Sequence, residues 1–173
     1  MMTKIRIWHA SRDPYHCAFR LIRLLLGCKD QSLAFDRLRL IDMFLLYPVL
    51  LHSVSMTRAV KNRFQTLDIP KESEVFIRLP GPAVLAQDLS LYQTAAASQL
   101  AAREILNTER LRAGTAALNI HAVPGDIRAR VEVKEKEEPG LCGFLTSDLM
   151  SIPLTGRDGL YRRTGVTKWD RLL

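Results

Sequence analysis

Cysteine and histidine are scarce in this chain and scattered along it. The 173 residues include three cysteines and four histidines, and none of them stands in a pattern with the spacing of metal ligands. We therefore expect neither a zinc site nor a framework of disulfides. Cys17, Cys28 and Cys142 lie in apolar surroundings, which predicts buried free thiols in a reducing compartment.

A hydrophobic run long enough to cross a membrane is also missing. The most apolar stretch, LIDMFLLYPVLL at residues 40–51, spans 12 residues and contains Asp42 and Pro48. A bilayer span needs roughly 20 apolar residues, so this stretch predicts a core helix. The first residues also lack the apolar run of a secretory signal. We expect a cytoplasmic protein without a membrane partner.

The common catalytic motifs are missing as well. No G-x-S-x-G presents a nucleophile, and Gly165 is followed by valine where a phosphate-binding loop requires lysine. Asp126, Glu132 and Lys134 are the residue types of a metal-dependent nuclease. The two acids are only six positions apart, which leaves little room for two strands and a turn. We expect no catalytic residue, no metal and no cofactor, and hence no enzymatic activity.

Positive charge, in contrast, is abundant and uneven. The net charge is +7, and residues 1–86 hold 13 Lys and Arg against 7 Asp and Glu, which leaves +6 in that half. An anionic partner is therefore plausible, because such a field attracts nucleic acid or an acidic protein surface. Our candidates for DNA contact are Arg20, Arg23, Arg58 and Lys61. The alternative for such a basic stripe is an ordinary solvated helix face.

Helical signals dominate the first third of the chain. Asp13 followed by Pro14 predicts a helix start, and the helix is expected to end near Gly27. A second helix is expected to begin at a Ser32 cap and to run, buried, to Pro48, which ends or kinks it. The expected inner face of the first helix is Tyr15, Phe19, Ile22 and Leu26.

Asp42 is an isolated acid within that second, apolar helix. An unpaired carboxylate in such surroundings would be costly, so it requires a cation. Arg39 lies three residues earlier on the same helix face and is the partner that spacing favours. We predict a structural ion pair between Arg39 and Asp42.

The remaining signals predict a mainly α-helical protein with a minor β-hairpin. Residues 55–67 are typical of a basic third helix, residues 83–106 of a long alanine-rich helix and residues 141–154 of a short one. A hairpin around Gly114, at residues 108–123, would resemble the wing of a winged helix. Residues 75–79 are expected to form a strand, and residues 126–138 alternate like a strand but have the composition of a helix, which we favour. All 173 residues are expected to form a single, compact helical domain.

The last segment, residues 156–173, is unusually rich in glycine, arginine and aromatic residues for a chain end. Glycine lets the backbone turn sharply and approach a surface closely. Arginine forks and flat aromatic rings are common at the centres of protein interfaces. We therefore expect this tail to fold back on the body and to bind a partner through Gly159, Tyr161, Arg162, Arg163 and Trp169.

Three stretches together resemble a known family. DPYH at residues 13–16, DRLRLIDMFLLYP at residues 36–48 and GLYRRTG at residues 159–165 are similar to motifs of the middle components of bacterial ABC-three-component systems, which include the small subunit of Lamassu-type anti-phage defence. The tail departs from that pattern at Tyr161, where lysine is usual, and at residues 168–170.

The resemblance implies a non-catalytic subunit between an SMC-like (Rad50-like) ABC ATPase, which senses DNA, and an effector, commonly a nuclease. DNA would then be a partner mainly through the complex. A stand-alone winged-helix DNA-binding regulator is the alternative, favoured by the charge of residues 1–86. The salt dependence of DNA binding distinguishes the two, because a regulator binds duplex DNA by itself.

Overall fold

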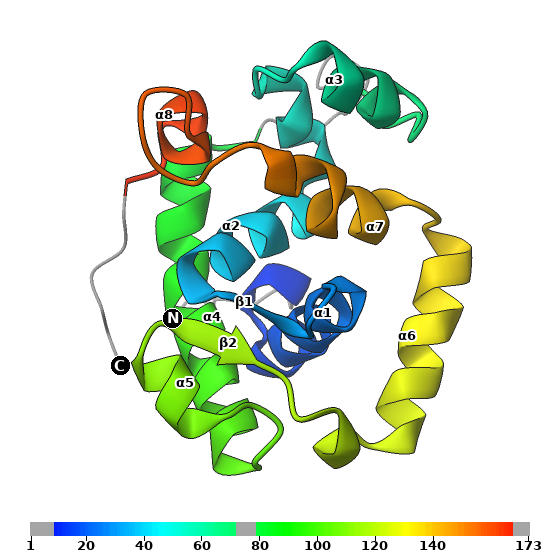
Figure 1. Ribbon diagram of the computed structural model, residues 1–173, viewed down its shortest axis with the longest axis vertical. Coiled ribbons are helices and arrows are strands. Elements are labelled where there is room, and N and C mark those ends of the chain that lie inside the picture. The colour runs from blue at the N-terminus through cyan, green and yellow to red at the C-terminus, as the bar shows by residue number, and fades with distance from the viewer. Residues whose placement is uncertain (1–8, 72–78, 168–173) are drawn as a thin grey trace, which may run out of the picture.

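The computed structural model describes residues 9–71 and 79–167 as a helical body around one buried core (Figure 1). The predicted mainly α-helical class is confirmed, whereas a winged helix is not. The expected strand at residues 75–79 lies almost entirely outside the described residues. The α-helices are α1 (Pro14–Gly27), α2 (Phe35–Leu46), α3 (Arg58–Gln65), α4 (Pro82–Ala102), α5 (Thr108–Arg112), α6 (Gly125–Glu137), α7 (Leu141–Thr146) and α8 (Leu160–Thr164).

Helix α1 begins and ends where the sequence predicted. The Asp13 carboxylate accepts a hydrogen bond from the backbone N–H of Tyr15 at 2.9 Å, and Pro14 occupies the first helical position. The predicted inner face was right in part: Ile22 is buried and Phe19 and Leu26 are partly buried, but Tyr15 is 70% exposed. The face that points into the core also contains Cys17, Leu21, Leu24 and Leu25.

Helix α2 is the central element of the body. Every residue from Leu38 to Leu45 is buried, so this helix contacts neighbours all round. It ends at Leu46, and Pro48 begins a 3-10 helix, Pro48–Ser53, as expected from the proline. The predicted Ser32 cap was wrong, because Ser32 lies in a strand and Ala34 precedes the helix.

The small sheet joins two distant segments of the chain. Strand β1 (Ser32–Ala34) pairs antiparallel with β2 (Thr115–Ala117), with Leu33 opposite Ala116. The predicted hairpin at residues 108–123 was wrong: helix α5 occupies its first half and β2 pairs with β1. Gly114 has a φ of +89° and turns the chain from α5 into β2. Part of the segment expected to form a wing therefore pairs with β1, the strand that directly precedes α2.

Helix α4 runs along one side of the body and packs against α1 and α2 (Figure 1). On its inner face, Leu85, Leu89, Ala96 and Leu100 are buried, and Tyr92 is half-buried. Ala96 and Ala97 have no exposed surface, so small side chains allow close approach of the neighbouring helices.

Helix α6 confirms the helical prediction for residues 126–138 and is the least embedded long helix. Throughout its length, all of which the structure describes, Val131 is the only buried residue. Helix α7 and a 3-10 turn, Asp148–Ser151, then return the chain to α2. In the described ranges, we found no helix with the length and apolarity needed to traverse a bilayer.

Candidate partner-binding tail and the charged network beneath it

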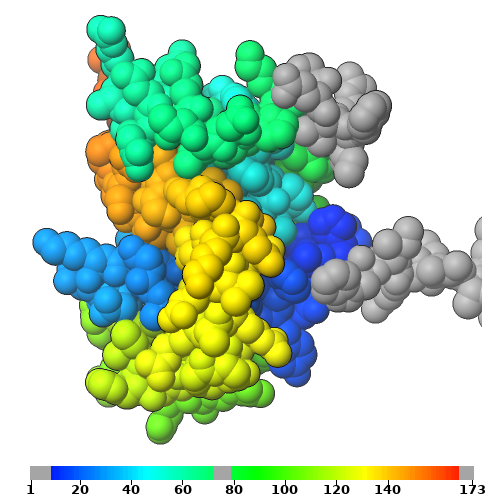
Figure 2. Space-filling model, turned by 90° about the vertical axis from the view of Figure 1, so that its right-hand side faces the viewer, coloured from blue at the N-terminus to red at the C-terminus, as the bar shows by residue number. Residues whose placement is uncertain are grey.

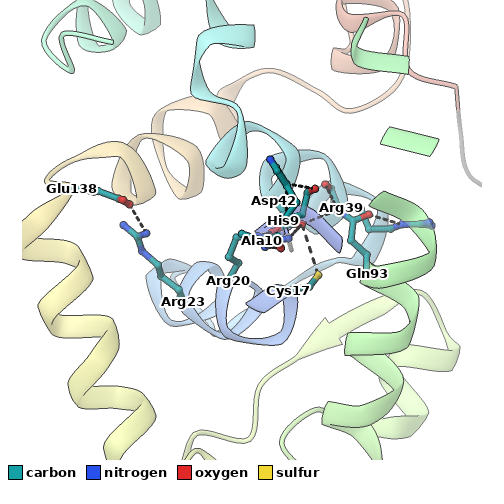
Figure 3. Close-up of polar contacts among 10 residues, drawn as sticks. His9, Ala10, Cys17, Arg20, Arg23, Arg39, Asp42, Gln93 and Glu138 are labelled. Carbon is teal, nitrogen blue, oxygen red and sulfur yellow. Dashed lines mark hydrogen bonds and ion pairs between the residues drawn. The ribbon is translucent and has the colours of Figure 1, made fainter. Parts of the chain in front are cut away.

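A buried ion pair lies where α1, α2 and α4 meet (Figure 3). The Arg20 guanidinium of α1 donates from Nε to Asp42 Oδ1 at 2.6 Å and from Nη2 to Oδ2 at 3.1 Å. Asp42 is fully buried and Arg20 is 5% exposed. This forked geometry gives the carboxylate two charge-assisted hydrogen bonds, which is the arrangement a buried charge requires.

The predicted partner of Asp42 was therefore the wrong arginine. Arg39 forms its ion pair with Asp36, at 4.0 Å, and its guanidinium donates to the hydroxyl of Ser90 on α4. Sequence spacing compared positions within one helix, whereas the closest cation comes from a neighbouring helix 22 residues earlier. Both arginines are structural, as is Asp42, but they connect α2 to different elements.

Gln93 of α4 completes this network. Its amide Nε2 donates to Asp42 Oδ2 at 2.8 Å and to the backbone carbonyl of Arg39 at 2.9 Å. Gln93 is 1% exposed, and sequence reasoning missed it. A polar residue within the apolar stripe of a helix was the available signal, because such a residue must find a partner in the core.

Burial and nearby charges together set the pKa values of the buried groups. Burial alone would lower the pKa of Arg20, but the Asp42 carboxylate outweighs it and the pKa is raised. Burial raises the pKa of the Cys28 thiol to about 11 and, with Glu135 nearby, that of Cys142 to about 12. The cysteines were correctly predicted as buried free thiols. They stay protonated near neutral pH and are poor nucleophiles.

Arg20 and Arg23 were also candidates for DNA contact, and the structure contradicts both. Arg23 is 4% exposed, and its guanidinium donates to Glu135 at 2.6 Å and to Glu138 at 2.8 Å. Glu138 directly follows α6, so this ion-pair cluster fastens α6 to α1. Neither arginine has a surface that a phosphate could reach.

Arg58 and Lys61 have a different environment. Both are exposed on α3, which begins at a Thr57 cap, and neither side chain has a hydrogen bond or ion pair among the described residues. Arg63 on the same helix lies 3.6 Å from Asp148 and is also largely exposed. Contact with DNA through Arg58 and Lys61 stays a prediction.

The described part of the tail, residues 156–167, packs on the body through buried side chains. The backbone N–H of Leu160 donates to Pro153 O at 2.8 Å, and Leu160 and Val166 are buried. A Cβ at Gly159 would lie 2.5 Å from the backbone of Thr155, so glycine is required there. Helix α8 then ends at Gly165, whose φ is +72°.

The side chains of the tail that were predicted to bind a partner differ in their surroundings. Arg163 donates to the backbone carbonyl of Ser55 and, at 2.5 Å, to that of Asp158, so it holds the tail in place. Tyr161 is half-buried, and burial together with the Asp36 carboxylate raises its pKa. Arg162 is exposed and has no partner among the described residues. Trp169 lies outside them.

Metal-dependent chemistry finds no support in the described parts of the chain. No group of three His, Cys, Asp or Glu side chains within them could hold a metal ion. Asp126 and Glu132, the acids of the nuclease-like pattern, lie on one continuous helix, α6. The two-strand arrangement that this chemistry needs is therefore replaced by a helix.

Comparison with protein families decides the identity of the chain. The model of the ABC-three component (ABC-3C) system Middle Component 5 family matches residues 6–170. The chain belongs to this family. No curated protein and no solved structure is detectably similar to it.

Membership in the Middle Component 5 family makes the chain a middle component of an ABC-three-component system, and implies that its partners are other components of that system. The tail and the buried network described above thus belong to a subunit that works in a complex.

Proposed function

We propose that this middle component is a non-catalytic subunit that bridges an SMC-like ABC ATPase and an effector nuclease. The complex would serve bacterial defence against phages and plasmids and would be of the Lamassu type. The ATPase senses foreign DNA, and the middle component holds the effector until that signal arrives. The chain works by being bound between the two.

The observation that carries this proposal is the ordered tail. A segment with few buried contacts is mobile, so a surface segment is ordered only where its own contacts hold it. Here Leu160 and Val166 are buried in the body, and Arg163 is bonded to Ser55. This support leaves Arg162 exposed on an ordered backbone, so binding a partner through it does not require the segment itself to be ordered.

A role without catalysis agrees with the chemistry of the described side chains. The three thiols are buried and their pKa values are raised, which disfavours the reactive thiolate. The buried pair of Arg20 and Asp42 is fully satisfied by internal bonds and lies away from the surface. These groups stabilise the helical body.

Co-purification with the ATPase tests the proposal. Arg162→Glu should weaken binding of the ATPase by at least about tenfold, because it reverses an exposed charge within the interface. Truncation after Thr155 should abolish binding. Arg112→Glu, on exposed α5, is the matched control and should bind normally. Circular dichroism verifies that each variant is folded.

Normal binding by a folded Arg162→Glu protein, together with normal binding by a folded truncation, would overturn the tail as the ATPase contact. Turnover of any substrate by the purified chain, with loss of turnover on a single side-chain change, would overturn the non-catalytic role.

A stand-alone DNA-binding regulator is the second candidate, favoured by the exposed Arg58 and Lys61 of α3. The described residues lack the hairpin that would form a wing, because β2 pairs with β1. A regulator should bind duplex DNA by itself with an affinity that falls steeply as salt rises. The bridging subunit should bind DNA weakly alone.

A further inference from the structure

A large groove lies where α6 passes α1, away from the tail. It encloses about 780 Å³ and is lined by α1, by the end of α4 and the residues that follow it, and by α6. Figure 2 shows α6 in front of α1, which emerges on either side of it. Figure 1 shows α6 and α8 on different sides of α2, so the groove and the tail are separate surfaces.

The lining of this groove is mostly apolar. Phe19, Ile22 and Ile127 are partly or fully buried at its base, whereas Tyr15 and Val133 are 70% and 54% exposed. These two belong to the small set of large, exposed apolar side chains among the described residues. The first-helix face that the sequence assigned to the core, starting with Tyr15, thus lines a surface groove.

Three of the charged residues along the groove are paired or cap a helix, and three have no partner among the described residues. Lys134 pairs with Glu137 at 3.0 Å, and the Asp13 carboxylate caps α1. Arg103 at the end of α4 and Arg130 on α6 are exposed and have no partner among the described residues.

Asp126 also lines the groove and is exposed without a partner among the described residues. It lies in the first turn of α6, and Arg103 lies at the end of α4, so the helix dipoles favour both of these charges alike. Two unpaired arginines against one unpaired aspartate leave the described lining with a net unpaired charge of +1.

The dimensions of the groove fit a helix. Its outer wall, α6, has 13 residues and is about 20 Å long at 1.5 Å per residue. That length accommodates three to four turns of a second helix with an apolar stripe, the usual occupant of such grooves. The wall is held in place, because the ion pairs of Arg23 with Glu135 and Glu138 fasten α6 to α1.

We propose that this groove binds an amphipathic helix of another component of the complex, with carboxylates flanking its apolar stripe to pair with Arg103 and Arg130. The inference rests on the bridging function and supplies the second surface that a bridge requires. The tail and the groove then contact different components.

Site-specific photo-crosslinking in the assembled complex tests the groove. A benzoyl-phenylalanine at Val133 should crosslink to an acidic, amphipathic helical segment of another component, identified by mass spectrometry. The same group at Val84, which is 51% exposed on α4 and outside the groove, is the control and should not crosslink to that segment.

Matched substitutions measure the energetic contribution. Val133→Asp should weaken assembly by at least about tenfold, whereas Val84→Asp should change it by less than about twofold. Arg103→Glu combined with Arg130→Glu should weaken assembly similarly. Arg128→Glu, an exposed charge on α6 outside the groove, should not.

Each outcome has one meaning. If the complex assembles but no acidic helix crosslinks above the Val84 control, the groove proposal fails and the bridging function stands. Crosslinks only to a second copy of this chain also overturn it. If the wild-type chain joins no complex at all, both proposals fail.

Discussion

The cations of α1 and those of α3 look alike in the sequence and have opposite roles in the structure. Arg20 and Arg23 recur at helical spacing on α1, and Arg58 and Lys61 do so on α3. The first two are 5% and 4% exposed and bonded to carboxylates. The second two are exposed and without partners among the described residues. Only the pair on α3 is available to an anionic partner.

The immediate neighbours explain this difference. Arg20 and Arg23 lie within FRLIRLLL, where leucine and isoleucine surround each arginine, so the helix is buried on most sides. Arg58 and Lys61 lie within TRAVKNRFQ, which has only Val60 and Phe64 to bury. Charge spacing alone does not distinguish a phosphate-binding face from a core ion pair. The apolar content between the charges does.

The largest loss of stability should follow removal of Arg20, one of the two buried cations of α1. Arg20→Ala leaves Asp42 fully buried without its charge partner, which typically costs about 3–5 kcal/mol. Urea unfolding should show this loss in the free energy of unfolding. Arg58→Ala should change that free energy by less than about 0.5 kcal/mol.

A double substitution sharpens the result. Arg20→Met with Asp42→Leu removes both charges and should recover most of the stability lost in Arg20→Ala. An equally unstable double variant would mean that packing around Arg20 and the bond from Gln93 to Asp42, rather than the charge of Arg20, stabilise the core.

A smaller effect is expected at Arg23, because its two carboxylate partners are 37% and 45% exposed and partly screened by water. Burial of Glu138 disfavours its ionised form, but hydrogen bonds from Arg23 and Lys134 outweigh this and lower its pKa below the ordinary 4.5. The ion pair therefore stabilises the fold above that value and loses its effect as the pH falls through the lowered pKa.

Arg23→Ala should accordingly cost about 1–2 kcal/mol near neutral pH, the scale of charge-assisted hydrogen bonds that are partly solvated. The difference from wild type should shrink in acid. Urea unfolding across this pH range measures both. The exposed control Arg128→Ala should show no such pH dependence, and a constant deficit at Arg23 would contradict the linkage to Glu138.

Local signals predicted much of the fold, and distant pairings account for most of the errors. The Asp13–Pro14 start and the stop at Pro48 depend on adjacent residues, and both were predicted correctly. The pairing of Leu33 with Ala116 joins segments more than 80 residues apart, and no turn signal marks it. Ser32 therefore resembled a helix cap while belonging to a strand.

The tail illustrates the same limit at the candidate site. Its glycines predicted close backbone approach, which Gly159 shows against Thr155. The sequence could not separate Arg162 from Arg163, because the difference depends on the carbonyl of Ser55, 108 residues away. Arg163 supports the tail, and Arg162 remains free to bind.

Substitution of the exposed cations of α3 is expected to have the smallest effect on stability. It is expected to have the largest effect on function. Arg58→Glu combined with Lys61→Glu should leave the free energy of unfolding within about 0.5 kcal/mol of wild type, since neither side chain has an internal partner among the described residues. Complex assembly should also be unchanged. If these residues touch DNA held by the ATPase, the DNA-stimulated activity of the complex should fall. The slope of the logarithm of the DNA-binding constant against the logarithm of salt concentration should also become shallower by about two, one unit for each phosphate contact.

The control for this last variant is Arg112→Glu combined with Arg110→Glu, an equal charge reversal on α5. A general effect of net charge would lower DNA binding equally in both variants, because long-range attraction depends on total charge. A loss confined to α3 would assign the phosphate contacts to Arg58 and Lys61. Unchanged activity in the α3 variant would remove DNA contact from the functions of this subunit, and then neither side of the comparison would bind nucleic acid.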